Sequence, residues 1–150
     1  MKIDNKKKVK VIKRLFYLIS VIIALVALAL FLFDYPYLAL ACVGVFSLWF
    51  LFFHVADYHY IEFSDADNKI VLRYYKAIRL GSTQYNSIEF PQSILKNFLF
   101  ENSVFGKMSD VTILVTTARG VAEYPSVSLS ALSVNDRVKM KAAFVEILSR

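Results

Sequence analysis

Cysteine and glycine are scarce in this sequence, and each scarcity excludes a class of function. Cys42 is the only cysteine among 150 residues, so no internal disulfide can form, which fits a reducing compartment. The four glycines are scattered between residues 44 and 120, too dispersed to form one phosphate-binding loop. Thr116, Thr117 and Ser126 offer hydroxyl groups, but no histidine lies among them to act as a base. We therefore expect a protein that is not an enzyme and uses no cofactor or metal.

Charge is absent from two long stretches. Residues 15–33 and 37–55 are apolar runs of 19 residues each, joined by residues 34–36. As a helix, each run is about 28 Å long, close to the roughly 30 Å of a bilayer's hydrocarbon core. The pattern predicts a membrane α-helical hairpin of two transmembrane helices over residues 15–55. Since transport pathways need ionisable groups at membrane depth, we do not expect a channel or pump built by this chain alone.

The net charge of +6 is concentrated at the start of the chain. The first 14 residues hold seven basic residues and one acid, whereas the rest of the chain is neutral. Short basic flanks stay in the cytoplasm and attract anionic lipid, so residues 1–14 are interpreted as a basic cytoplasmic tail. We expect a multi-pass protein of the cell inner (cytoplasmic) membrane with both termini cytoplasmic. The residues that set this topology are Lys6, Lys7, Lys8, Lys10, Lys13 and Arg14.

A cleaved signal peptide is the competing interpretation of the first run. The usual apolar core of a signal peptide has about 7 to 15 residues, and here the run is longer and a second run follows after three residues. We therefore expect a membrane hairpin rather than a signal peptide.

Small residues recur at helical spacing in both apolar runs. This spacing predicts close packing of the two helices, although such residues are also common in membrane helices generally. The candidate helix-packing residues are Ser20, Ala24, Ala27, Ala41, Gly44 and Ser47.

Residues 57–150 form a separate soluble module in which apolar and polar residues alternate. Alternation predicts strands over residues 58–63, 70–75, 78–80, 85–90, 94–101, 111–117 and 121–131. The last segment changes to helical spacing, with Ser133 as its N-cap and Asp136 three residues later. The predicted apolar stripe of this helix comprises Val134, Val138, Ala142, Val145 and Leu148, broadened by Met140, Phe144 and Ile147, with Arg137, Lys139, Lys141, Glu146 and Arg150 outside.

These elements together resemble a known family. The residues that carry the resemblance are the hairpin of residues 60–63 and 70–75, the segment 85–91, the turn 103–106 and the ending 124–133. The chain after residue 14 resembles small bacterial membrane proteins that carry a pleckstrin-homology-like domain behind two transmembrane helices. The resemblance implies a mainly-β pleckstrin-homology-like barrel closed by a C-terminal amphipathic helix. It implies a binding or scaffolding module, and the fold alone does not determine the ligand.

Basic residues near the first hairpin are the candidate ligand-binding residues. In several pleckstrin-homology-like domains, basic residues near the first hairpins hold anionic lipid head groups, so the resemblance implies this role for Lys69, Arg73, Lys76 and Arg79. The alternative is that these residues only solvate the surface, since the module is neutral overall. His54, Asp57 and His59 have metal-ligand side chains, but His59 begins a strand and no Cys or Glu is expected to converge on them, so we interpret them as polar residues at the membrane exit.

The sequence therefore leads to a class of function. We expect a non-enzymatic inner-membrane protein that presents its module at the cytoplasmic surface, as an accessory or assembly subunit of a membrane complex. Two alternatives remain open: a sensor of anionic lipid or of a small ligand that uses the basic hairpin, and a self-assembling membrane effector. The expected partners are membrane lipid and a protein or a second copy of the chain. Nucleic acid is not expected, because the module has no basic face with interleaved aromatic residues.

Overall fold

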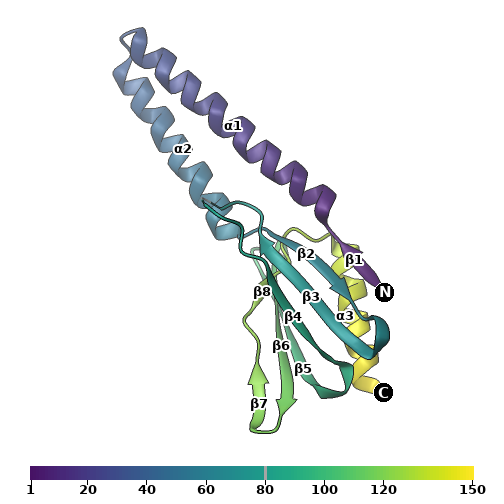
Figure 1. Cartoon of the computed structure of the whole chain (residues 1–150). Coiled ribbons are helices and arrows are strands. Elements are labelled where there is room, and N and C mark those ends of the chain that lie inside the picture. The colour runs from purple at the N-terminus through teal and green to yellow at the C-terminus, as the bar shows by residue number, and fades with distance from the viewer. Residues whose placement is uncertain (80) are drawn as a thin grey trace.

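Two antiparallel helices project from a β-rich module in the computed structural model (Figure 1), which describes residues 1–79 and 81–150. Helix α1 (Lys6–Leu32) has 27 residues and α2 (Pro36–Ala56) has 21, which correspond to about 40 Å and 31 Å. Both helices are long and apolar enough to cross a membrane, and almost none of their most apolar stretches is buried inside the chain. They therefore differ from the core helices of a soluble protein, whose apolar residues are covered.

Local backbone chemistry sets the ends of α2. Pro36 occupies its first turn, where the missing N–H has no helical partner to lose. Asp34, in the turn before it, and Asp57, directly after α2, both have a positive φ, of 59° and 43°. The left-handed conformation of Asp57 ends α2 and turns the chain into the first strand of the module.

The contact surface between α1 and α2, called the hairpin seam below, includes the large aromatic residues Phe46, Trp49 and Phe53 of α2. The buried or half-buried positions are Phe16, Ile19, Ser20, Ile23, Ala27 and Leu30 on α1, and Ala39, Cys42, Phe46, Trp49 and Phe53 on α2. Ser20 and Ala27 thus lie in the seam as predicted. For Ala24 and for the whole α2 set (Ala41, Gly44, Ser47) the prediction is wrong, because these residues are exposed. Phenylalanine and tryptophan bury more apolar area against α1 than alanine and glycine do.

The first residues of the chain belong to the module, which the sequence analysis missed. Strand β1 (Lys2–Asp4) pairs antiparallel with β2 (His59–Ser64), with Ile3 opposite Phe63. Asn5 is buried and donates from Nδ2 to the His59 carbonyl at 3.0 Å, while its Oδ1 accepts from the Ile61 N–H at 2.8 Å. The hairpin is therefore inserted between two neighbouring strands of one sheet, and residues 1–14 are not a free tail.

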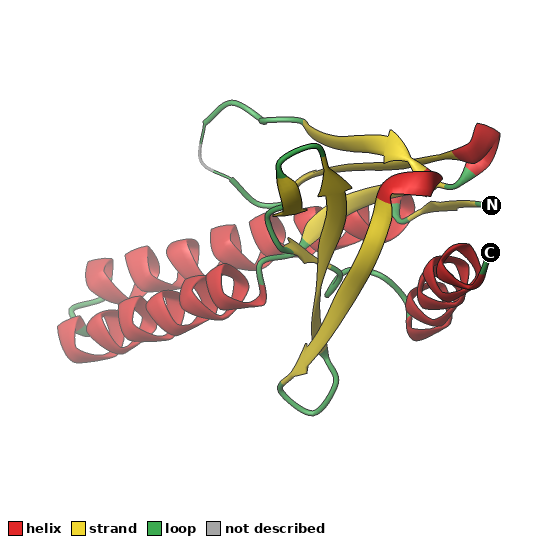
Figure 2. Cartoon of the chain, turned by 90° about the horizontal axis from the view of Figure 1, so that it is seen from below, coloured by secondary structure: helices red, strands yellow, loops and turns green. Residues whose placement is uncertain are grey.

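The module consists of two antiparallel sheets (Figure 2). Sheet A has the order β1-β2-β3-β4, with β3 (Lys69–Lys76) and β4 (Asn86–Pro91). Sheet B has the order β5 (Leu95–Ser103), β6 (Met108–Thr117), β7 (Gly120–Glu123), and β8 (Val127–Ser128) also pairs with β6. The short 3-10 helices η1 (Ala66–Asn68) and η2 (Gln92–Ile94) lie between strands. Neither sheet closes on itself in the described residues, so the structure shows two sheets where a barrel was predicted.

Most predicted strands are confirmed, and two predictions fail. The segment 121–131 is two short strands rather than one, since Pro125 interrupts it and has no N–H to donate. In the predicted strand 78–80, Ile78 and Arg79 lie outside any strand, and residue 80 lies outside the described residues.

Helix α3 (Val134–Ser149) covers the space between the two sheets. The predicted N-cap is confirmed: Ser133 Oγ accepts from the Asp136 N–H at 3.1 Å. The aromatic ring of Phe144 is fully buried, with its centroid 5.4 Å from that of Phe63 and 5.2 Å from that of Phe98. The helix is therefore the element that joins the cores of sheets A and B.

The orientation predicted for α3 is partly wrong. Met140, Ala143 and Phe144 face the core, whereas Val134, Val138, Ala142, Val145 and Leu148 are exposed. Arg137, predicted to lie outside, reaches inward and donates to four acceptors: the carbonyls of Gly106, Lys107 and Ser130 and the Ser109 Oγ. At about 3.6 residues per turn, these five exposed residues lie on a different side of α3 from Met140, Ala143 and Phe144. Apolar residues therefore cover most of the helical wheel, and sequence spacing alone could not tell which part of that wide arc would face the sheets.

Candidate functional site

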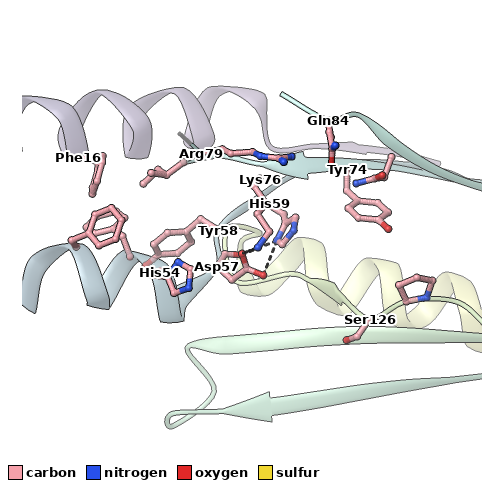
Figure 3. Close-up of a pocket in the computed structure, with 15 residues that line it drawn as sticks. Phe16, His54, Asp57, Tyr58, His59, Tyr74, Lys76, Arg79, Gln84 and Ser126 are labelled. Carbon is pink, nitrogen blue, oxygen red and sulfur yellow. Dashed lines mark hydrogen bonds and ion pairs between the residues drawn. The ribbon is translucent and has the colours of Figure 1, made fainter. Parts of the chain in front are cut away.

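A cavity of about 700 Å³ lies where the hairpin joins the module (Figure 3), and we call it the junction cavity. Segments that are distant in the sequence form its walls. The helices contribute Phe16, Phe50 and Phe53, the end of β3 and the residues after it contribute Lys76 and Arg79, and the loop before β8 contributes Pro125 and Ser126. The cavity is thus apolar toward the helices and polar toward the sheets.

The apolar wall is an aromatic cluster at the module end of the hairpin. The ring centroids of Phe16 and Phe53 are 5.0 Å apart, and those of Phe16 and Phe50 are 6.4 Å apart. His54 stacks on Phe50 with a centroid distance of 6.4 Å and is exposed. Ligand sites typically combine such an apolar lining with a few oriented polar groups.

Asp57 organises the polar wall. Its Oδ1 lies 3.1 Å from Lys76 Nζ, and its Oδ2 lies 3.7 Å from His59 Nδ1, which is also 2.7 Å from the Asp57 carbonyl oxygen. The left-handed turn at Asp57 places this carboxylate between the two side chains, as Figure 3 shows. The carboxylate offsets part of the charge of Lys76. Arg79 is exposed and makes no ion pair within the described part of the chain, so it is the cation of the cavity with free hydrogen-bonding capacity.

Burial lowers the pKa of His59 below its ordinary value of 6.5, because the desolvated ring disfavours the charged form. The Asp57 carboxylate and carbonyl oppose this effect, and Lys76 adds to it. His59 is therefore neutral at pH 7, and the positive charge of the junction cavity comes from Lys76 and Arg79.

The four predicted ligand-binding residues are not brought together. Lys76 and Arg79 line the junction cavity, but Arg73 faces the opposite side of β3 and lines a second groove of about 420 Å³ together with Lys6. Lys69 begins β3 opposite Pro91 at the far end of that strand, seven residues from Lys76 and hence about 23 Å away.

The second groove is less suited to an anion. Arg73 Nη1 lies 4.0 Å from Glu62, which also contacts Lys2 Nζ at 2.8 Å, so this carboxylate offsets part of the positive charge beside the groove. The groove is lined by stacked tyrosines, with centroids of Tyr60 and Tyr75 4.7 Å apart. Burial, followed by the nearby Asp4 and Glu62 carboxylates, raises the pKa of Tyr60 to about 12, so this phenol stays protonated.

The predicted topology residues form a basic collar around α1. Lys6, Lys7, Lys8, Lys10, Lys13 and Arg14 are all exposed in its first turns. The same turns bury Val9 against Ala77 and Ala131 of the module. Both the collar and the module are therefore held at a fixed position relative to the helices.

Sequence reasoning missed two features of the site. The aromatic wall looked like ordinary membrane-helix composition, and the role of Asp57 depends on a positive φ that no sequence pattern signals. The side chains of His54, Asp57 and His59 do not form a metal site. Among residues 1–79 and 81–150, no group of three His, Cys, Asp or Glu side chains is placed to hold a metal ion.

Comparison of the chain with protein-family models, with curated proteins and with solved structures gives no match in any of the three searches.

Proposed function

We propose that this protein is a non-enzymatic inner-membrane protein that holds a pleckstrin-homology-like module at the cytoplasmic surface and binds an anionic lipid head group in the junction cavity. The observation that supports the proposal is that the cavity is apolar on the side of the helices and basic on the side of the sheets. An amphiphile needs cations for its head and an apolar surface for the first part of its tails, and Arg79 and Phe53 supply these on opposite sides.

The membrane placement follows from the helices and the collar. Helices α1 and α2 are long enough to span a bilayer, and the collar lies at the end that joins the module. Basic flanks remain in the cytoplasm, so the module and the junction cavity face the cytoplasmic leaflet, which is rich in anionic lipid.

The arrangement of the module supports the pleckstrin-homology-like part of the proposal. Two four-stranded antiparallel sheets and a C-terminal helix that packs over their shared core occur in the order that the resemblance implies. The membrane hairpin replaces the connection between the first two strands of sheet A. This insertion explains why the cavity is built from both parts.

The test compares lipid selection by charge-reversed variants. The full-length chain is purified in a non-ionic detergent and incubated with equimolar phosphatidylglycerol and phosphatidylcholine, and the bound lipids are counted by native mass spectrometry. We expect a phosphatidylglycerol preference of about fivefold, from roughly 1 kcal/mol per cation, that Arg79→Glu abolishes. Lys69→Glu makes the same charge change at the far end of β3 and should leave the preference intact. Equal preference in Arg79→Glu and wild type would refute the site.

A second function, as an accessory subunit of a membrane complex, is favoured by the exposed side of α3. Val134, Val138 and Val145 are between 51% and 69% exposed on one side of this helix, and the described chain covers none of them. Contiguous exposed apolar residues often mark a protein contact. Val138→Glu should fold normally and lose a stoichiometric partner during purification in mild detergent, whereas Lys139→Glu, on the neighbouring position, should retain it. Recovery of the wild-type chain without a partner in several mild detergents would contradict this function.

A further inference from the structure

The turn between β5 and β6 exposes two apolar side chains in a strained conformation. Phe105 is fully exposed and Val104 is 54% exposed. Both have a positive φ, of 55° and 50°, and Gly106 follows with 76°. Asn and Gly are the residues that normally occupy such left-handed positions, and a β-branched valine there is a clear outlier. Phe105 does not pack on the module and Val104 is only partly covered, so core packing does not explain why two apolar residues occupy this turn.

Arg137 fixes the position of this turn. Its guanidinium donates to the carbonyls of Gly106 at 3.0 Å and Lys107 at 3.2 Å, immediately after the two apolar residues. The same side chain donates to Ser109 Oγ at 2.7 Å and to the Ser130 carbonyl at 3.1 Å. The turn is therefore held by the first turn of α3, and Val104 and Phe105 are presented from a rigid base.

The turn lies at the end of the module that carries the hairpin. Helix α3 begins beside β1 (Figure 1), and Ser133 and Asp136 line a shared groove with Lys6 and Lys7 of the basic collar. Strand β8 pairs with the beginning of β6, and the loop before β8 lines the junction cavity. The start of α3, which holds the turn, and the start of β6, which follows it, thus both lie at the end of the module that carries the hairpin.

We propose that Val104 and Phe105 insert into the head-group layer of the membrane as a third contact beside the two helices. Phenylalanine and valine lose unfavourable contact with water there, and Lys107, directly after the turn, faces the anionic lipid of the same leaflet. Together with the hairpin, this contact fixes the tilt of the module over the bilayer. The inference rests on the proposed membrane anchoring but not on the ligand of the junction cavity.

Tryptophan fluorescence tests the insertion. Trp49 is the only tryptophan of the chain and lies in the hairpin seam. In a Trp49→Phe background, Phe105→Trp is reconstituted into nanodiscs whose phosphatidylcholine and phosphatidylglycerol carry bromine at a shallow acyl position. We expect blue-shifted emission that brominated lipid quenches at least twofold and that aqueous acrylamide quenches weakly.

Val121→Trp in the same background is the matched control. Val121 is 58% exposed, so it is also a surface residue, but it lies in β7 next to the β6–β7 turn, at the opposite end of β6. Its emission should resemble that of tryptophan in water. Because Phe105 touches nothing in the module, its replacement by tryptophan leaves the fold unchanged, which circular dichroism verifies.

The outcomes separate this inference from the proposed function. If Trp49 of the wild-type chain escapes quenching by lipid brominated deep in the acyl chains, the membrane anchoring itself is wrong. If Trp49 is quenched but the tryptophan at position 105 is as accessible to acrylamide as the one at position 121, anchoring stands and the third contact is refuted.

Discussion

The hairpin and the module bury their apolar residues in different ways. Along the hairpin, most apolar side chains are exposed and only the seam is covered, whereas the module encloses fully buried residues such as Phe63, Leu72 and Phe144. The first arrangement suits lipid as a solvent, and the second suits water. The lipid-exposed surface of the hairpin and the enclosed core of the module meet only at the junction, and the candidate ligand site lies there.

The largest expected effect comes from the core of the module. Phe144→Ala leaves a cavity between sheets A and B and should lower the free energy of unfolding of the module by about 3–5 kcal/mol. Phe52→Ala, on the exposed side of α2, should have no measurable effect in detergent. Thermal unfolding followed by near-ultraviolet circular dichroism measures both. Equal destabilisation by the two variants would break the distinction between the regions.

Asn5 ties the two regions together. Asn5→Ala removes both hydrogen bonds to β2 and leaves a buried carbonyl and a buried N–H unpaired, which should cost about 1–3 kcal/mol. Asn135→Ala, at an exposed position of α3, is the control. Hydrogen exchange should show faster exchange in β1 and β2 with the core of sheet B unchanged. Unaltered exchange in β2 would mean that β1 does not hold the hairpin to the module.

The pKa of His59 predicts a pH dependence confined to the junction. Its folded-state pKa is lowered from 6.5, so the unfolded chain binds the proton more readily and stability is lost as pH falls through that value toward the lower, folded-state pKa. The groups that face the ring are Asp57, Lys76 and Asp110. Between pH 7.5 and pH 5.5, the melting temperature should drop more in the wild type than in His59→Gln. An identical drop in both would remove His59 as the cause.

The strained turn offers a smaller, stabilising change. The double substitution Val104→Asn and Phe105→Gly places residues suited to a positive φ and should raise stability by about 1 kcal/mol in detergent. Val121→Asn, at an exposed position where φ is not positive, should give no gain. A lower melting temperature for the double variant would show that the two apolar residues pack on something in the folded protein.

The smallest expected effect is at Gly44. A Cβ atom at this position would meet no atom within 4 Å in the single chain, and the position is exposed, so Gly44→Leu should leave the monomer's stability unchanged. The exposed residues Ala41 and Ser47 flank it on the same helix. If the hairpins self-assemble through this side, crosslinking in membranes should show oligomers in the wild type that Gly44→Leu removes. An unchanged crosslinking pattern would contradict self-assembly through this surface.

Local patterns predicted the elements, and contacts distant in sequence decided their orientation. The two apolar runs, the strands β2, β3, β5 and β6, and the Ser133 cap all follow from spacing and composition within one segment. The inward position of Arg137 depends on acceptors about 30 residues away, and β1 depends on a partner strand on the other side of the hairpin. Half of the predicted ligand residues reached the junction cavity, because alternation in β3 sends Arg73 and Lys76 to opposite faces.

Labelling of single cysteines in intact cells tests most directly whether the hairpin anchors the module inside the cell. In a Cys42→Ser background, a membrane-impermeant maleimide should label Tyr37→Cys from outside, in the first turn of α2 next to the α1–α2 turn. It should label Arg150→Cys, at the end of the module, only after the membrane is permeabilised. Labelling of Arg150→Cys in intact cells, with Tyr37→Cys protected, would contradict the account.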